Sequence, residues 1–413
     1  MRAALNRHVL SSSPDVERVA KIAAAAAWMR ILVALGFSLG VARWYGAEER
    51  GTVSYLVATT AVIVQLGDLG IPTALRITMT DIDSDIIRPY NYLFFRNGLC
   101  VLAIGAIVLV FTAETALPTA ILAGVVLAQL TMEVTVRFVS GALNAIGLFV
   151  LSQSLQLFAV TFQFATLCVF FVSVDRSDGL ALLALGVGSA MASVVALLVY
   201  WQLGLGGVTR TREIEAELSF IGRRSHLANS SIAVLLRSDQ IAIGLLGGPT
   251  LLGRYAVAVS IAEALRPRTQ SASQVVFRLA AEGSDFLKTR TSLLRSTVKF
   301  QLLLFVPVLA GAELFVPVLF GPEFDGMTVA ILLLLLAEIC FAVLLFSVRE
   351  LLGRGVPNLA TTVGLSAAAI GVVLNLLLIP RYGLHGAVTA TLLSYACGSI
   401  IGIWKRGEVN VSV

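Results

Sequence analysis

Long apolar segments separated by short polar ones recur along the whole chain. Each segment has roughly the 17 to 25 residues that an α-helix needs to cross a bilayer. We predict twelve such spans, at residues 22–43, 52–75, 93–112, 118–143, 148–173, 180–203, 221–246, 251–279, 298–319, 326–348, 357–379 and 384–404. The pattern therefore predicts an all-α polytopic membrane protein, with almost every residue inside or beside the bilayer.

Composition supports this class and argues against enzymes and nucleic-acid binding proteins. Only 13% of the residues are charged, against roughly 25% in soluble proteins, and the mean hydropathy is +0.89. The four cysteines are isolated in separate spans, without the paired spacing of metal ligands or disulfides. The sequence also lacks a phosphate-binding loop and the common catalytic motifs. We therefore expect no catalytic residue, no metal, no cofactor and no nucleic acid.

The positive residues predict how the chain is oriented. Of the 30 Lys and Arg residues, 19 lie in the two termini or in loops predicted on the same side of the membrane as the termini. Five lie in the loops predicted on the opposite side. Positive residues are enriched in cytoplasmic loops. We therefore predict a multi-pass protein of the bacterial cytoplasmic membrane with both termini in the cytoplasm. The net charge of +5 reflects this topology.

A polar segment in the middle of the chain predicts a division into two halves. Residues 204–218 are rich in glycine and then in charge, and we interpret them as a cytoplasmic linker. Residues 1–203 and 219–413 would each form a six-helix bundle. The halves echo each other weakly, because Gly46 and Gly51 follow the first span as Gly248 and Gly253 follow the seventh. Transporters with such parallel repeats bind substrate between the halves.

Several motifs, taken in order, resemble those of polysaccharide flippases. The chain is similar to the O-antigen and polysaccharide flippase family of the multidrug/oligosaccharidyl-lipid/polysaccharide exporter superfamily. The matching segments are Gly67-Asp68-Leu-Gly70-Ile-Pro-Thr-Ala74, Arg237-Ser-Asp239 with Gly244, Leu252-Gly253-Arg-Tyr255-Ala-Val-Ala258, Phe320-Gly321-Pro322-Glu323-Phe324, and Asn375 to Pro380 with Tyr382-Gly383-Leu-His-Gly386-Ala387. They extend over nearly the whole chain.

The resemblance implies a fold and a function. We expect two six-helix bundles around a central cavity, as in MATE transporters, and alternating access. The substrate would be an undecaprenyl-diphosphate-linked oligosaccharide used in cell-surface polysaccharide synthesis. Membrane lipids, a polysaccharide polymerase and glycosyltransferases are the expected partners of a functional monomer. A drug or cation exporter, or a membrane glycan polymerase or glycosyltransferase, is the alternative.

Arginines inside the spans are the candidates for binding the diphosphate. Arg266 and Arg268 flank Pro267 in the eighth span, and each would cost about 2.5 to 3.5 kcal/mol at the centre of a membrane helix without a partner. Their guanidinium groups suit phosphate oxygens. Arg237 and Arg30 are further candidates. The alternative for Arg266 is an ion pair with Glu263 at i−3, whereas Arg268 has no acidic residue nearby.

Polar stripes on the fourth and fifth spans are candidates for the glycan. Gln129, Glu133 and Arg137 recur at steps of four on one helical face. The alternative is that Glu133 and Arg137 neutralise each other. On the fifth span, Gln156 and Gln163 share a face, and their amides suit either sugar hydroxyls or interhelical hydrogen bonds.

The seventh span carries a further polar stripe and one acidic residue apart from it. Gln240 lies with Arg237 on the polar stripe of this span and is another glycan candidate. Asp239 should point away from Arg237, which favours interhelical pairing over a cation or proton site.

Asp68, Asp239, Glu133 and Glu263 are the candidates for ion pairing or for coupling transport to an ion. Asp68 lies between Gly67 and Gly70, before Pro72, where the helix should be weak and could bend. An ion pair of Arg30 with Asp68 or Asp239 is the alternative to phosphate binding by Arg30.

Overall fold

The computed structural model describes residues 13–78, 84–112, 118–174, 179–281 and 287–411, and these form helices without any strand. The predicted all-α class is therefore confirmed. The first helices are α2 (Ser13–Gly67), α3 (Ile71–Thr78), α4 (Ser84–Thr112), α5 (Thr119–Ala145), α6 (Phe149–Ser173) and α7 (Leu180–Gln202). They are followed by α8 (Arg212–Leu235), α9 (Ser238–Leu246), α10 (Gly248–Glu263), α11 (Arg266–Ala281), α12 (Leu287–Phe320), the short 3-10 helix η1 (Pro322–Phe324), α13 (Thr328–Gly353) and α14 (Pro357–Val411).

The predicted spans coincide with these helices. Within the described residues, seven helices are long and apolar enough to cross a membrane. Two of them, α2 and α14, have 55 residues each and contain a sharp turn, at Gly46 (φ 86°) and at Gly383 (φ 53°). Glycine adopts these positive φ values without a steric penalty. Helix α14 therefore contains two predicted spans, and α2 contains the first span and most of the second.

Three of the predicted spans, the second, the seventh and the eighth, are interrupted. The second breaks between Gly67 and Ile71, where Leu69 has a positive φ of 51° and the Asp68 carboxylate accepts a hydrogen bond from the Gly70 amide (2.7 Å). The helix therefore ends where the sequence predicts weakness. The eighth breaks just before Arg266, so that Pro267 occupies the first turn of α11, where a missing amide costs little.

The break in the seventh span corrects our prediction of one continuous helix from residue 221 to 246. Helix α8 begins earlier, at Arg212 inside the predicted linker, and ends at Leu235. Arg237 lies in a non-helical conformation (φ −131°, ψ −13°) before α9. Because the helix is interrupted at this residue, the angle between Arg237 and Asp239 cannot be derived from helical periodicity.

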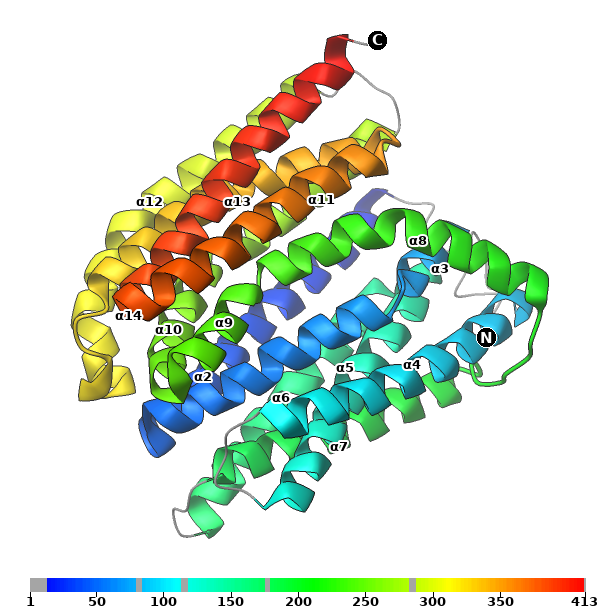
Figure 1. The fold of residues 1–413 in the computed structure, drawn as a ribbon. Coiled ribbons are helices and arrows are strands. Elements are labelled where there is room, and N and C mark those ends of the chain that lie inside the picture. Colours follow the sequence, from blue (N-terminus) through cyan, green and yellow to red (C-terminus); the bar gives the residue numbers. More distant parts are fainter. Residues whose placement is uncertain (1–12, 79–83, 113–117, 175–178, 282–286, 412–413) are drawn as a thin grey trace.

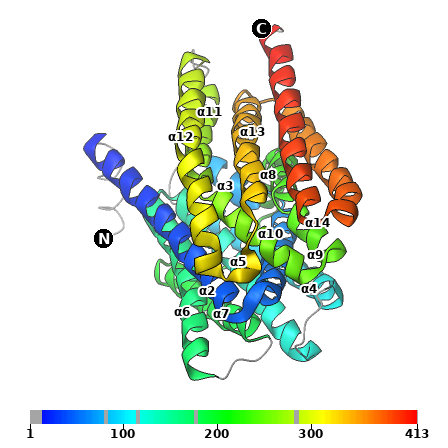
Figure 2. The ribbon, with the colours of Figure 1, turned by 90° about the vertical axis from the view of Figure 1, so that its left-hand side faces the viewer.

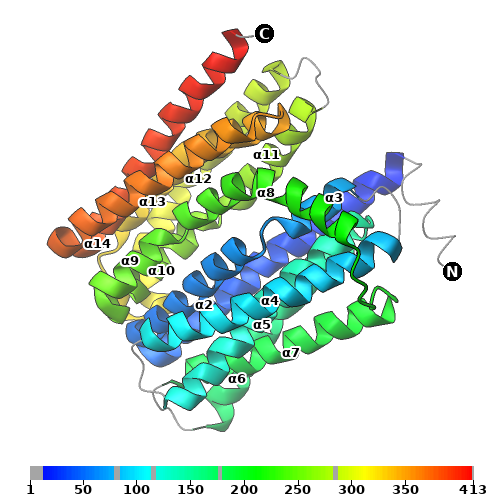
Figure 3. The ribbon, with the colours of Figure 1, turned by 45° about the vertical axis from the view of Figure 1, so that its right-hand side comes forward.

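The helices form two groups. Helices α2 to α7 pack together, and α9 to α14 pack together beside them (Figures 1 and 3). Helix α8 packs against α3 and α4 of the first group and against α14 of the second. The view turned by 90° shows α11 and α12 extending beside α13 and α14, away from α6 and α7 (Figure 2). The division into two domains at residues 203 and 219 stays a prediction.

At one end the two groups touch, backbone against backbone. A Cβ added to Gly51 of α2 would lie 1.7 Å from the Pro249 carbonyl oxygen, and one added to Gly253 of α10 would lie 1.8 Å from the Ala47 oxygen. The Glu323 carboxylate accepts a hydrogen bond from the Ala47 amide (3.0 Å). Gly51 and Gly253, one of the two glycine pairs that echo each other in sequence, are therefore contact partners, at the end that the charge distribution assigns to the outside.

Candidate functional site

Arg266 lies at the centre of a buried ion network in the second group of helices. Its guanidinium donates to both oxygens of Glu338 on α13, through Nε (3.2 Å) and through Nη2, and to Glu263 at the end of α10 (2.8 Å). It also stacks over the Phe341 ring, 4.8 Å from the centroid. Arg266 and Glu338 are 6% and 2% exposed. The ion pair with Glu263 that the spacing allows is present, and all three guanidinium nitrogens contact carboxylates.

Arg237 shares one of these carboxylates but is more accessible. Its Nη1 lies 3.5 Å from Glu263 Oε1, the same oxygen that Arg266 contacts at 2.8 Å. The side chain of Arg237 is 31% exposed, against 8% for Arg266. Since Glu263 already contacts Arg266 more closely, Arg237 keeps donors that another anion can use.

A second ion network joins the first group of helices to α8. Arg137 on α5 donates to Asp68 Oδ2 (3.0 Å) and to Gln65. The other Asp68 oxygen lies 3.4 Å from Nδ1 of His226 on α8. The break after Gly67 places the Asp68 side chain between these two helices. Asp68 therefore pairs with Arg137, and the alternative partner that we considered, Arg30, is wrong.

Glu133 is not neutralised by Arg137 alone. It forms no hydrogen bond or ion pair with any described residue, so the alternative of a direct ion pair between Glu133 and Arg137 is not present in this structure. Instead, the charges of Arg137, Arg237 and Arg30 all act on this one carboxylate. The Nε of Arg30 is buried without a hydrogen-bond partner among the described residues. The charges of three arginines, two from the first group and one at the start of the second, thus act on a single acid.

Asp239 belongs to a separate buried cluster. Its carboxylate accepts hydrogen bonds from the Tyr255 hydroxyl on α10, from Thr391 on α14 (3.3 Å) and from the Gln240 amide (2.7 Å). Asp239 therefore links three helices, which is the interhelical role that the sequence favours. It has no ion pair with Arg30 or any other described residue. Gln240 is buried beside it and is 6% exposed.

The amides expected to bind a glycan are mostly engaged with each other. Gln163 donates to Gln129 (3.2 Å) and to Ser189 (2.9 Å), and Ser189 donates to Gln129 (2.7 Å), which joins α5, α6 and α7. Gln129 is 1% exposed. The alternative of interhelical hydrogen bonding therefore describes both glutamines in this conformation. Gln156 is half-buried and forms no hydrogen bond with a described side chain.

Arg50, one of the five positive residues predicted on the outer side, is buried. Its partners are the hydroxyls of Ser38 (3.0 Å), Ser54 and Ser260 (3.4 Å), and none of its described contacts is acidic. Ser260 belongs to α10, so Arg50 bridges the two groups close to the Gly51 contact. Arg50 lies in a polar sequence beside Gly51, and no sequence pattern links it to Ser260, 210 residues away.

Arg268 faces the surface. It donates to Ser296 on α12 (2.7 Å) and lies over the Phe300 ring, 4.8 Å from the centroid. Ser296 lines a hollow of about 710 Å³ on α12, together with Lys288, Arg295 and Lys299. Arg268 has no acidic partner among the described residues, as its sequence neighbourhood predicts.

The networks between the helices contain several charged groups. The arginines with contacts given above are Arg30, Arg50, Arg137, Arg237 and Arg266, and the carboxylates are Asp68, Glu133, Asp239, Glu263 and Glu338. Arg76 and Arg349 add further positive charge, so the arginines outnumber the carboxylates. The pairing of Arg30 and Arg237 is incomplete. Within the described residues, no group of His, Cys, Asp and Glu side chains could hold a metal ion.

Comparisons with known proteins confirm the transporter fold. No family model matches the sequence. The chain is 26% identical to the probable flippase AglR of Haloferax volcanii over 54% of its length, and it spans about half, 49%, of that relative. The structure resembles the lipid II flippase MurJ in an inward closed conformation, with a TM-score of 0.71 and 11% identity over 93% of this chain and 87% of MurJ.

A second solved structure belongs to a different branch of transporters. An inward-facing MATE family multidrug resistance transporter of the MOP superfamily gives a TM-score of 0.63 at 14% identity, over 99% of this chain and 98% of that one. The expected resemblance to flippases and the MATE-like polytopic membrane fold are thus both confirmed. The matched proteins are flippases and transporters, in agreement with the expectation of a transporter and not an enzyme.

Proposed function

We propose that this chain, with the fold shared by MurJ and the MATE transporters, is a flippase for a lipid-linked oligosaccharide. The substrate would be an undecaprenyl-diphosphate-linked glycan that moves from the inner to the outer leaflet of the bacterial cytoplasmic membrane. The reaction requires no covalent chemistry. One observation carries the proposal, namely that arginines from both groups of helices are incompletely paired: Arg30 Nε has no hydrogen-bond partner among the described residues, and Arg237 shares one oxygen of Glu263 with Arg266.

This arrangement suits a diphosphate. Guanidinium groups form paired hydrogen bonds with phosphate oxygens, and these are stronger than bonds between neutral groups. A diphosphate carries more negative charge than Glu133, and it would compete with this carboxylate for the same arginines. Because the arginines belong to both groups of helices, a bound diphosphate would be held between them, as alternating access requires.

The exporter of drugs or cations is less well supported by the residues. A cationic substrate is expected to contact acidic and aromatic side chains. Glu263, Glu338 and Asp68 are already paired with arginine, and the Asp239 carboxylate accepts hydrogen bonds from Tyr255 and Thr391. Glu133 remains, but the charges of three arginines act on it.

Transport in proteoliposomes tests the proposal. The full chain would be reconstituted with a fluorescent polyprenyl-diphosphate disaccharide, and the fraction accessible to an external quencher would be followed in time. We expect protein-dependent flipping that Arg237→Gln slows by tenfold or more. Ethidium efflux from the same vesicles is the control. Efflux of ethidium without movement of the lipid would overturn the proposal in favour of a cation exporter.

The orientation is tested separately. With the termini in the cytoplasm, single cysteines placed between residues 210 and 217 should react with impermeant reagents only after the cells are opened. Cysteines between residues 323 and 326 should react in intact cells. The reverse labelling would show that the predicted topology is inverted.

A further inference from the structure

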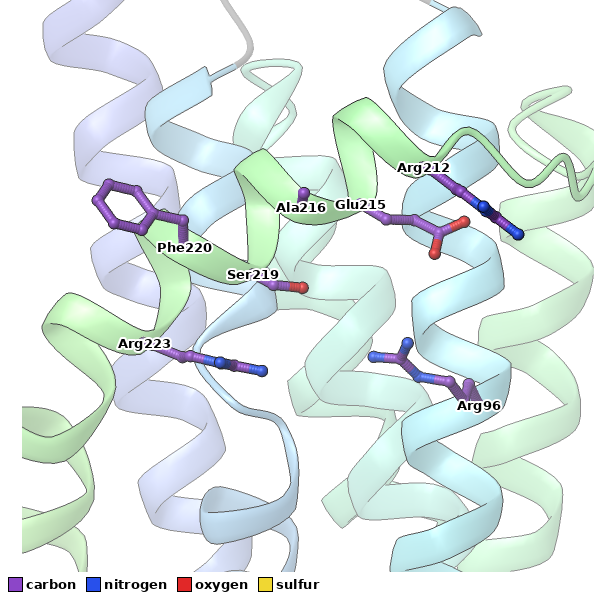
Figure 4. Close-up of a pocket in the computed structure, with 7 residues that line it drawn as sticks. All are labelled: Arg96, Arg212, Glu215, Ala216, Ser219, Phe220 and Arg223. Carbon is purple, nitrogen blue, oxygen red and sulfur yellow. The ribbon is translucent and has the colours of Figure 1, made fainter.

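Helix α8 and helix α4 enclose a basic hollow that is separate from the arginines around Glu133. It has a volume of about 660 Å³, and one face of α8 lines it with Arg212, Glu215, Ser219, Phe220 and Arg223. Arg96 of α4 forms the opposite side. Figure 4 shows that Arg96 and Arg223 point toward each other from opposite sides of this space. The hollow thus offers cations from two helices to a single ligand.

The positive charge in this hollow is not neutralised by the protein. Arg96, Arg212 and Arg223 are exposed and form no ion pair with a described residue. Arg96 uses only its Nε, which donates to the neighbouring Asn97 (3.2 Å), so that its terminal nitrogens remain for a ligand. The one acid, Glu215, is 8% exposed, and Arg210 lies 3.8 Å from it. The lining therefore favours an anion.

The hollow is bordered by apolar side chains that a soluble anion would not need. Phe220 on α8 is 62% exposed, and Phe95 and Leu99, next to Arg96 and one turn beyond it on α4, are 58% and 71% exposed. Phe95 and Leu99 belong to the predicted span 93–112, whose exposed apolar side chains we expect to face lipid tails. The arginines therefore lie at the boundary between the apolar, lipid-facing surface and the polar surface. Lipid headgroups lie at this depth.

We propose that the hollow between α4 and α8 binds the phosphate of an anionic lipid, with Arg96 and Arg223 on opposite sides of the phosphate and Phe95, Leu99 and Phe220 against the tail. Two lipids share this chemistry, a polyprenyl diphosphate and a phospholipid such as phosphatidylglycerol. The inference does not require transport, so it stands or falls independently of the flippase proposal. By the charge distribution, the site lies in the cytoplasmic leaflet.

A second hollow in the molecule supplies a matched control. The hollow on α12 has a similar volume, about 710 Å³, and three basic residues, Lys288, Arg295 and Lys299. All of its lining residues belong to one helix, and the nearby cation of a second helix, Arg268 on α11, already donates to Ser296 of the lining. Removing two charges from either hollow changes the net charge of the protein equally.

Binding to the purified full chain tests the proposal. Farnesyl diphosphate and short-chain phosphatidylglycerol would be titrated in detergent and bound molecules counted by native mass spectrometry. For Arg96→Gln with Arg223→Gln we expect about 30-fold weaker binding of at least one lipid, from roughly fivefold per basic residue near a lipid surface. Lys288→Gln with Lys299→Gln should weaken it less than twofold.

Two further results decide the source of the phosphate and the role of folding. If the Gln pair loses more affinity for farnesyl diphosphate than for phosphatidylglycerol, the diphosphate lipid is the ligand. Equal losses for the two would identify any anionic lipid as the ligand. Arg96→Lys with Arg223→Lys keeps the charge and should retain binding within about fivefold. The proposal is overturned if the Gln pair binds both lipids with wild-type affinity. It is also overturned if the α12 control variant loses as much lipid affinity as the Gln pair.

Discussion

Arg266 and Arg268 are two residues apart on the same helix and have opposite surroundings. Arg266 is 6% exposed and contacts two carboxylates, whereas Arg268 is exposed and contacts one hydroxyl and one ring. Two residues correspond to roughly 200° around a helix, so one side chain points toward α13 and the other toward α12. The comparison shows that burial and pairing, and not the residue type, separate a structural arginine from an available one.

The largest expected effect of this difference is on stability. Arg266→Ala should lower the free energy of unfolding by about 3 to 5 kcal/mol, because it leaves Glu338 buried without a partner. The shift of the thermal unfolding midpoint in detergent measures this loss. Arg266→Met combined with Glu338→Leu is the control, and it should recover most of the stability. A double variant as unstable as the single one would contradict the ion-pair explanation.

Substitution of Arg137 should destabilise the protein less than that of Arg266 and more than that of Arg268. It therefore tests whether the exposure of an arginine sets the size of the stability loss. Arg137 pairs with Asp68 at 3.0 Å, but its side chain is 30% exposed. Water can therefore solvate part of the charge, and we expect Arg137→Ala to cost about 1 to 2 kcal/mol in unfolding. The same thermal measurement applies, with Arg137→Lys as the matched variant. A loss as large as that of Arg266→Ala would show that exposure is a poor guide here.

Glu133 tests whether incompletely paired arginines bind substrate. Glu133→Gln removes the competing carboxylate, so the affinity for a polyprenyl diphosphate should rise about five- to tenfold, or by about 1 to 1.4 kcal/mol. Arg237→Gln should lower it by a similar factor. Equilibrium binding of farnesyl diphosphate measures both, in a background where Arg96 and Arg223 are replaced by Gln. Wild-type affinity in both variants would place the diphosphate elsewhere.

Arg268 completes the comparison with the smallest effect on folding. Arg268→Ala should change the free energy of unfolding by less than about 0.5 kcal/mol, as for most surface substitutions. We still expect weaker flipping at limiting substrate, with partial recovery in Arg268→Lys, because a point charge keeps the attraction and loses the planar fork. Flipping at the wild-type rate would remove Arg268 from the binding site.

The sequence predicts the membrane spans well because apolar length alone defines them. The predicted span 118–143 corresponds to α5 (Thr119–Ala145), and 180–203 corresponds to α7 (Leu180–Gln202). The weak point at Asp68 is also visible, since glycines flank it and a proline follows. The break at Arg237 is not, because no glycine or proline marks it and the preceding residues are ordinary helix formers.

The candidate site is less predictable because its partners are distant in sequence. Helical spacing identifies the pair of Glu263 with Arg266, three residues apart, but it also favours Glu133 with Arg137, which the structure does not form. The partner of Arg137 is 69 residues away and that of Arg266 on α13 is 72 residues away. Periodicity reports which side chains share a helical face, and it contains no information about which helix lies opposite.

The contact between Gly51 and Gly253 has a consequence for how fast this end of the molecule can open. It is formed by main-chain atoms, and glycine has no rotamers to lose when the surfaces close or to regain when they part. The Cα hydrogens can act as weak donors to the facing carbonyl oxygens of Pro249 and Ala47, a contact worth about 0.5 to 1 kcal/mol each. The glycine contact itself therefore separates and re-forms without side-chain reordering, and the barrier to opening here comes from the neighbouring hydrogen bonds of Arg50 with Ser260 and of Glu323 with the Ala47 amide, which must break. A single added methyl group at either glycine would prevent closure, and the effect would be the same from both sides.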